Sequence, residues 1–274
     1  MSIRLDRALA MRGLARSRSH AQQLIDSGLV TVVGETRPKA STRVDDATVI
    51  EVGEGAAHYV SRAAHKLVGA LDACSPLGLE VEGRDCLDAG ASTGGFTQVL
   101  LDSGARHVTA VDVGHSQLAS QIADDARVTV VERTNVKDLD TGSPGAGASL
   151  VVADLSFISL THVVPALVRT AARDADFVLM VKPQFEVGRS KLSSRGVVTS
   201  HADRQAAVLA VASCMEAAGL TLHQVSRSPL PGPEGNVEFF VWGSGAWQAS
   251  NRTGRPQLTG ESLVSRISEE VTRP

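Results

Sequence analysis

Cysteine is scarce in this sequence, and a long apolar segment is absent from it. Only Cys74, Cys86 and Cys214 occur in the 274 residues, and no two of them form a C-x-x-C pair. An odd number of widely spaced cysteines argues against a disulfide framework and against a structural zinc site. No stretch approaches the roughly 20 apolar residues that span a bilayer, and the arginine-rich start lacks the apolar core of a secretory signal. We therefore expect a cytoplasmic protein that enters no membrane.

The charge of the chain is unevenly distributed. Apolar residues make up 43% and charged residues 21% of the chain, which is ordinary globular usage. Residues 1–43 hold eight Arg or Lys against three acidic residues, a net +5 in a chain of net charge -3, which leaves -8 for the rest. A compact basic segment on an acidic body is typical of a phosphate-binding attachment. A solvated basic face without a partner is the alternative.

The first fifty residues predict two helices and a small sheet. Residues 4–12 carry apolar side chains on one helical face and stop at Gly13. Ser17 can cap a second helix whose apolar residues repeat at helical spacing until Gly28. The stretches LVTVV and VDDATVIEV then alternate as strands on either side of a turn near Gly34.

The residues of this segment form a known pattern. R-L-D-x-x-L is followed by S-R-x-x-A-x-x-L-I-x-x-G-x-V-x-V-x-G and by a lysine after the turn. Over residues 3–52 the pattern resembles the S4-type RNA-binding domain of ribosomal proteins and pseudouridine synthases. The resemblance implies that the second helix and the following hairpin face RNA, because planar guanidinium groups can hold two phosphate oxygens at once. The implied RNA-binding residues are Arg4, Arg16, Arg18, Arg37 and Lys39.

Composition also predicts where the domains divide. The Gly- and Ala-rich GEGAAH at 53–58 suits a joint that permits relative movement. We expect residues 1–56 to form the RNA-binding domain, 57–62 a linker and 63–246 a catalytic domain. The polar residues 247–274 are expected to be a loose tail with at most one short helix.

Short apolar runs alternate with helical stretches throughout the second domain. This alternation is typical of a parallel sheet covered by helices on both faces. It predicts an α/β, doubly wound, Rossmann-like sheet behind the small α+β RNA-binding domain. The runs lie at 85–90, 107–113, 128–133, 149–157, 176–183, 220–226 and 237–243.

The first two runs end in a nucleotide-binding pattern. In an open parallel sheet, ligands bind beyond the carboxyl ends of the strands. The first run leads into DAGASTGGFT, and Asp112 follows 24 residues after Asp88, where a carboxylate can accept bonds from ribose hydroxyls. This turn lacks the dinucleotide G-x-G-x-x-G spacing and resembles the turn of methyltransferases that bind S-adenosylmethionine, with a nicotinamide dehydrogenase as the alternative. The expected cofactor-binding residues are Asp88, Gly90, Ser92, Gly94, Gly95, Asp112 and Asn135.

Four ionic residues complete the predicted site. Asp154 and Lys182 end the fourth and fifth runs, so both should face the same edge of the sheet. In methyltransferase sheets the seventh strand runs antiparallel, which would bring Glu238, at its start, to that edge. With Lys66, on the helix leading into the domain, they resemble the K-D-K-E tetrad of RNA ribose 2'-O-methyltransferases. We expect Lys182 to contact the 2'-hydroxyl, the two acids to orient the lysines, and Lys66 to steer the ribose or a phosphate. An ordinary ion pair at a sheet edge is the structural alternative.

Taken together, the motifs cover most of the chain. RLDRAL, VSRAAHKL, LDAGASTGGFTQVLL, VVADLSFISL, VKPQFEVG and SPLPGPEGNVEFF make it similar to the TlyA, or hemolysin A, family. The resemblance implies S-adenosylmethionine-dependent 2'-O-methylation of cytidines in small- and large-subunit ribosomal RNA, with no DNA, membrane or metal partner. Ala57-His58-Tyr59-Val60 replaces the Arg-x-Trp-Val linker of some members, so a linker role in cofactor affinity does not carry over. A membrane-active hemolysin and a non-catalytic ribosome-assembly factor are the remaining alternatives.

Overall fold

The computed structural model divides the chain into two compact units. It describes residues 2–15, 17–26, 29–33, 35, 38–52, 59–245 and 254–273. The division falls between Ala64 and His65, inside helix α3 (Ala63–Cys74). Each unit has its own apolar core. The expected linker at 57–62 stays a prediction, because Ala57 and His58 lie outside the described residues.

The N-terminal unit contains the two predicted helices, but two small sheets in place of one. Helices α1 (Leu5–Met11) and α2 (Arg18–Asp26) pack together, and Ser17 caps α2 by accepting the His20 backbone N–H at 3.1 Å. Each sheet is an antiparallel pair, and the four strands are β1 (Ile3–Arg4) with β3 (Arg43–Val44) and β2 (Val30–Val32) with β4 (Ile50–Val52). The four strands form two sheets because β3 pairs with β1, a strand too short to show an alternating pattern in the sequence.

The second unit is built on a seven-stranded sheet, as predicted. The strands are β5 (Asp85–Ala89), β6 (His107–Val111), β7 (Val128–Val131), β8 (Leu150–Ala153), β9 (Asp176–Val181), β10 (Thr221–Arg227) and β11 (Phe239–Ser244). Their order is β10-β11-β9-β8-β5-β6-β7, and β11 runs antiparallel to both of its neighbours. The chain moves outward from β5 to β7 and then returns to β8, so the strand order reverses between β5 and β8. This reversal is where a ligand crevice is expected.

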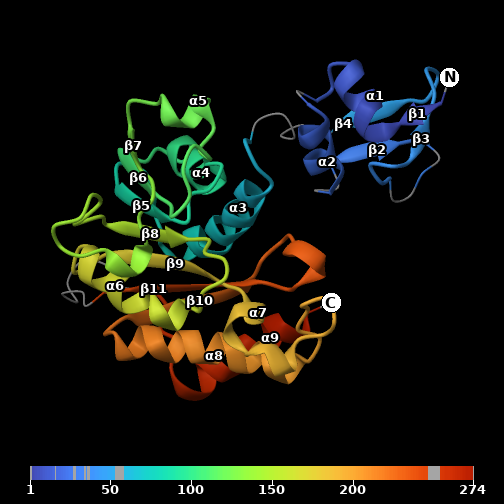
Figure 1. The fold of residues 1–274 in the computed structure, drawn as a ribbon. Coiled ribbons are helices and arrows are strands. Elements are labelled where there is room, and N and C mark those ends of the chain that lie inside the picture. Colours follow the sequence, from blue (N-terminus) through green and yellow to red (C-terminus); the bar gives the residue numbers. More distant parts are fainter. Residues whose placement is uncertain are drawn as a thin grey trace. The chain divides into compact units, whose positions relative to one another are not determined.

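Helices cover both faces of this sheet (Figure 1). On one face α6 (Val164–Thr170), α8 (His201–Ala217) and α9 (Gly260–Thr272) bury their apolar residues in one continuous core. On the other face α4 (Gly95–Asp102) packs on β5 and β6, and its Phe96 ring stacks 6.2 Å from that of Phe240. Short elements complete the unit: α5 (Ser120–Ala123), α7 (Pro183–Glu186) and the 3-10 turns Ser75–Leu77, Val136–Asp138, Leu160–His162, Arg189–Lys191 and Pro233–Gly235.

The expectation of a loose C-terminal tail was wrong. Helix α9 is 13 residues long and begins with a capping box formed by Thr259 and Ser262. Leu263, Ile267 and Val271 recur every four residues and are buried in the core. The charged residues between them give the segment a polar composition, which conceals this apolar stripe. Within the described parts of the chain, no helix is long and apolar enough to cross a membrane.

Candidate active site

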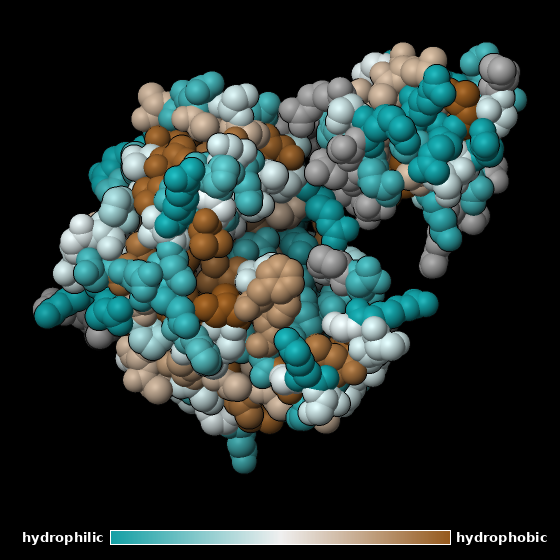
Figure 2. Space-filling model, viewed as in Figure 1, coloured by the Kyte–Doolittle hydropathy of each residue, from teal (hydrophilic) through white to brown (hydrophobic). Residues whose placement is uncertain are grey.

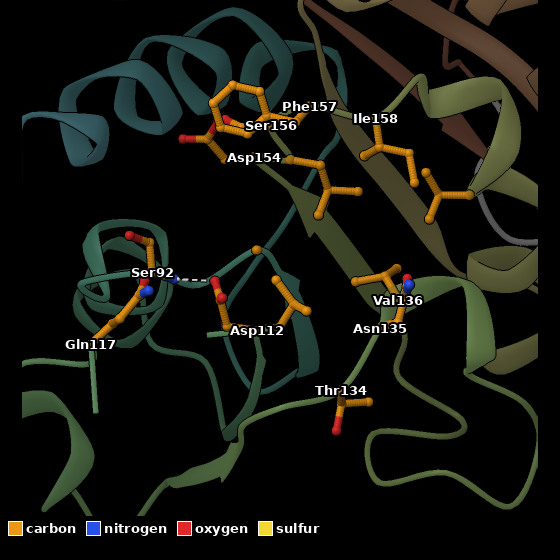
Figure 3. Close-up of a pocket in the computed structure, with 14 residues that line it drawn as sticks. Ser92, Asp112, Gln117, Thr134, Asn135, Val136, Asp154, Ser156, Phe157 and Ile158 are labelled. Carbon is orange, nitrogen blue, oxygen red and sulfur yellow. Dashed lines mark hydrogen bonds between the residues drawn. The ribbon is translucent and has the colours of Figure 1, made fainter. Parts of the chain in front are cut away.

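A cavity of about 460 Å³ opens at the carboxyl ends of the parallel strands, at the strand-order reversal (Figure 3). Five of the residues predicted from the sequence line it: Gly90, Ser92, Asp112, Asn135 and Asp154. Val136, Ile158 and Val163 add an apolar wall. A volume of this size, with apolar walls and a few polar groups, suits a small-molecule ligand.

In the turn after β5, the backbone at Gly90 lies close to the backbone at Asp154. Gly90 has a φ of +90°, and a Cβ there would lie 2.8 Å from the carbonyl oxygen of Asp154. Ser92 also has a positive φ, 47°, and its backbone N–H donates to Asp112 Oδ2 at 2.8 Å (Figure 3). The N–H of Gly114 donates to Asp112 Oδ1 at 2.7 Å. The carboxylate of Asp112 is therefore fixed by two backbone groups at the cavity wall.

Gly94 and Gly95 lie beside the cavity rather than on its lining. Gly94 has a φ of +95°, and a Cβ there would meet Leu118 Cδ1 at 2.9 Å. Gly95 begins α4 and is buried. In this structure Gly94 allows α4 to pack against the loop before α5, and the close approach to the cavity is made by Gly90.

Asp88 lies fully buried in β5, below the lining. The Thr97 hydroxyl donates to its Oδ2 at 2.7 Å, while among the described residues Oδ1 has no hydrogen-bond partner. Burial raises the pKa of Asp88 to about 7, against the opposing effect of the Thr97 hydrogen bond, and the negative charges of Asp154 and Asp112 add to the rise. A buried carboxyl group with an unpaired oxygen is a group that a cationic ligand could stabilise.

Lys182 and Asp154 form an ion pair at the cavity edge. Lys182 directly follows β9, and its Nζ lies 2.6 Å from Asp154 Oδ1. The same ammonium donates to Ser156 Oγ at 2.9 Å. Asp154 and Ser156 belong to the loop after β8 (Figure 3), so this one lysine joins the ends of two adjacent strands.

Lys66 and Glu238 form a second, more deeply buried ion pair. Lys66 Nζ lies 2.5 Å from Glu238 Oε2, with side-chain exposures of 6% and 0%. The Gln184 amide donates to Glu238 Oε1 at 3.5 Å. Because Phe239 is opposite Val181 in the β11–β9 register, Glu238 and Lys182 lie opposite each other one residue further along. The structure thus brings the four predicted ionic residues to one edge of the sheet as two ion pairs.

Ser156 and Gln184 were missed by the sequence reasoning. Each lies two residues beyond a strand-end residue that was predicted, Asp154 and Lys182 respectively. The only signal for them is this position, because a lone serine or glutamine after a strand carries no pattern of its own. Among the described residues no group of three His, Cys, Asp or Glu could hold a metal ion.

Two of the basic residues predicted to bind RNA contact one buried acid. Arg4 and Arg18 each contact the Asp6 carboxylate at 3.0 Å, while their own side chains are 45% and 63% exposed. The hydrogen bond from Arg4, joined by that from Arg18, lowers the pKa of Asp6 to about 2 against the effect of burial. Lys39 is exposed, and Arg16 and Arg37 lie outside the described residues. Arg4 and Arg18 are therefore paired with Asp6 and also expose part of their side chains to solvent.

The chain is similar to known protein families, curated proteins and solved structures. Residues 59–244 match the FtsJ-like methyltransferase family and residues 3–50 match the S4 domain. The 16S/23S rRNA (cytidine-2'-O)-methyltransferase TlyA of Mycobacterium tuberculosis is 53% identical over 240 residues, which are 87% of this chain and 88% of that protein. Hemolysin A of Brachyspira hyodysenteriae is 36% identical over 240 residues, 87% of this chain and 98% of that protein. A solved structure from Streptococcus thermophilus, provisionally named a hemolysin, has a TM-score of 0.72 and 32% identity and covers 99% of this chain and 95% of that one.

Proposed function

Because the chain belongs to the FtsJ-like methyltransferase family, we propose that it transfers a methyl group from S-adenosylmethionine to the ribose 2'-hydroxyl of cytidines in ribosomal RNA of both subunits. The S4 domain would bind the RNA through Arg4, Arg16, Arg18, Arg37 and Lys39. The same proposal puts the enzyme in the cytoplasm with its ribosomal substrate. The observation that carries the proposal is the meeting of two lysine–carboxylate pairs beside a cavity at the strand-order reversal.

The residues at the cavity fit S-adenosylmethionine. Asp112 has a free lone pair on each oxygen for the ribose hydroxyls, since each oxygen accepts only one described backbone N–H. Gly90 and Ser92 would line the amino-acid part, with Gly94 and Gly95 shaping the turn behind them, and Asn135 would border the adenine. The unpaired Oδ1 of buried Asp88 suits the positive charge of the ligand. When bound, the ligand supplies a methyl group attached to a positively charged sulfur.

Lys182 is suited to hold the 2'-oxygen of the acceptor ribose. The Lys182 ammonium has three N–H bonds; it donates one to Ser156 Oγ and forms an ion pair with Asp154 in the structure. We propose that another of these N–H bonds binds the 2'-oxygen and stabilises the negative charge that develops there. The 2'-oxygen would bond to the methyl carbon as the carbon–sulfur bond breaks, and the hydroxyl proton would pass to the Asp154 carboxylate, because the Lys182 ammonium has no site left to accept one.

Lys66 and Glu238 would align the nucleotide from the other side. Glu238 is held by Lys66 and by Gln184, so the Lys66 ammonium keeps a fixed place with donors to spare. We propose that it contacts the ribose or a neighbouring phosphate. Holding the acceptor ribose in the correct orientation lowers the activation barrier of the transfer, because the entropy of aligning the two reactants is then lost on binding and not in the reaction step.

The direct test is methyl transfer with purified components. The protein is incubated with radiolabelled S-adenosylmethionine and with unmethylated small or large ribosomal subunits, and methylated riboses are mapped by mass spectrometry. Lys182→Ala should abolish transfer while RNA binding is retained. Lys191→Ala is the matched control, because Lys191 also pairs with a carboxylate, Asp203, at 2.6 Å but lies outside the cavity lining. Near-normal turnover by Lys182→Ala, or no ribose methylation by the unaltered protein, would contradict the proposal.

A further inference from the structure

Two short segments form the part of the site that contains Lys182, and they contact each other at both ends and in the middle. The first, residues 154–160, follows β8 and contains both partners of the Lys182 ammonium. The second is Lys182 with α7, which ends at Glu186. Lys182 joins the two segments at one end. In the middle, the rings of Phe157 and Phe185 lie 5.3 Å apart at 47°.

Glu186 joins the same two segments at the other end. Its Oε1 accepts the backbone N–H of Leu160 at 2.9 Å, and its Oε2 accepts the Ser159 hydroxyl at 2.5 Å. Ser159 also caps the turn that begins at Leu160, through the Thr161 N–H at 3.2 Å. One half-buried carboxylate therefore fixes the point at which the 154–160 segment ends.

The 154–160 segment holds an unfavourable conformation between these two attachments. Phe157 has a φ of +64°, in the left-handed region, which costs a residue other than glycine of order 1–3 kcal/mol. Its side chain is 91% exposed, so burial of the ring does not offset this cost. Such strain persists only when the surrounding contacts over-determine the backbone. Glu186 supplies two of those contacts.

We propose that Glu186 is a positioning residue that holds the 154–160 segment in its strained form and so keeps Asp154 and Ser156 on the Lys182 ammonium. This inference rests on the proposed function, because it assigns Lys182 to the reacting hydroxyl. Among the contacts that the described residues make, the Glu186 carboxylate touches neither the cavity lining nor the Lys182 side chain. Its effect is on alignment, and a displacement of about 1 Å can reduce turnover about 100-fold.

The protonation of Glu186 should make turnover depend on pH, which a purely structural role for this residue would not do. Burial raises the pKa of Glu186, against the opposing effect of its bonds from Ser159 and Leu160. The titratable groups that face it are His162, whose charge lowers this pKa, and Cys214 on α8. The ionised form, which accepts both bonds, is lost as the pH falls through the raised pKa. Glutamine at this position could accept the Leu160 N–H and donate to Ser159 Oγ at any pH.

The test measures methyl transfer to ribosomal subunits by the full-length chain, with saturating S-adenosylmethionine and RNA. Glu186→Ala should lower kcat about 10- to 100-fold and leave the Kd for S-adenosylmethionine within about twofold of wild type. Glu186→Gln should restore most of the turnover. Its kcat, divided by that of the wild type, should rise as the pH is lowered. The exposed α8 residue Glu216 provides the control, since Glu216→Ala should leave kcat unchanged. If Glu186→Ala does not fold, Ser159→Ala, which removes one of the two bonds, is measured in its place.

The outcomes separate this inference from the proposed function. Without methylation by the unaltered protein, the proposed function fails. If the unaltered protein is active and Glu186→Ala or Ser159→Ala keeps full kcat, the positioning role is overturned. It is also overturned if kcat and cofactor affinity fall by the same factor, or if Glu186→Gln follows the wild-type pH profile, because these results describe general destabilisation.

Discussion

Replacing Asp88 by asparagine should change how the stability of the second unit depends on pH. Burial raises the pKa of Asp88 to about 7 from an ordinary value of 3.8. The folded state therefore holds a proton that the unfolded state releases above pH 4. The stability that this proton provides is complete below pH 4 and is lost as the pH rises towards 7. At about 1.4 kcal/mol per pH unit, the whole loss is about 4 kcal/mol.

The amide introduced by Asp88→Asn would be neutral at every pH and could still accept the Thr97 hydroxyl, which now bonds Oδ2 at 2.7 Å. Between pH 5 and pH 8 the stability of Asp88→Asn should thus rise relative to wild type by about 2 to 3 kcal/mol. For a domain of this size, that is about 5–10 °C in Tm. Melting curves of both proteins without ligand, at four pH values from 5 to 8, measure the difference. Asp72→Asn, at an exposed position of α3, is the control.

A positively charged ligand bound beside Asp88 should favour its ionised form, the opposite of what burial does. S-adenosylmethionine favours the ionised form of Asp88 if it lies near the unpaired Oδ1, so its affinity for the wild type should increase from pH 6 to pH 8 and that for Asp88→Asn should not. Titration calorimetry in buffers of different ionisation enthalpy would also detect the released proton. A Tm difference between the two proteins that stays constant with pH would refute the reasoning, because it would mean that Asp88 does not change protonation on folding.

Two further predictions concern the other charged clusters. Lys66→Met leaves the buried Glu238 without an opposite charge, so it should lower the free energy of unfolding by about 3–5 kcal/mol in urea titrations. Adding Glu238→Gln should restore most of this loss, and no recovery in the double variant would contradict the pairing. Arg18→Ala removes one cation from the N-terminal unit, so RNA affinity should fall and the slope of log K against log salt should flatten by about 0.7 to 0.9. Filter binding over a range of salt concentrations measures that slope, and an unchanged slope would mean that Arg18 serves only Asp6.

The sheet and its ligand-binding edge were predictable because each depends on a local signal. Each strand of the second unit is a short apolar run, and parallel strands end at a common edge, so the positions of Asp154 and Lys182 follow from where their runs stop. The last of these runs, strand β11, contains Phe240 and Trp242, and both are buried. The order of the remaining strands, once the reversal is assigned, is largely set by the short connections of an α/β sheet.

The contacts between distant segments were not predictable. The resemblance predicted that the four ionic residues share one edge, but it did not say which lysine pairs with which acid, so the contact of Lys66 with Glu238, 172 residues away, was not predicted. Glu186 follows Lys182 in a helix of four residues, too short for any periodic pattern, and its role depends on Ser159 and Leu160 in another segment. The docking of helix α9 into the core was missed because charged residues separate its buried residues.

The opposite edge of the same sheet shows how similar residues serve a different purpose. At the start of β9, Asp176 is fully buried and its carboxylate is paired with Arg84 at 2.6 Å, Arg255 at 2.6 Å and the Trp242 indole at 3.0 Å. Both oxygens of this carboxylate have partners, so they fix the segment before α9 to the sheet and leave no carboxyl oxygen for a ligand. At the carboxyl edge, by contrast, Asp88 keeps an unpaired oxygen beneath the cavity. A buried carboxyl oxygen costs stability unless it is paired, so the edge at which the fold leaves such an oxygen unpaired is the edge at which we expect the chemistry.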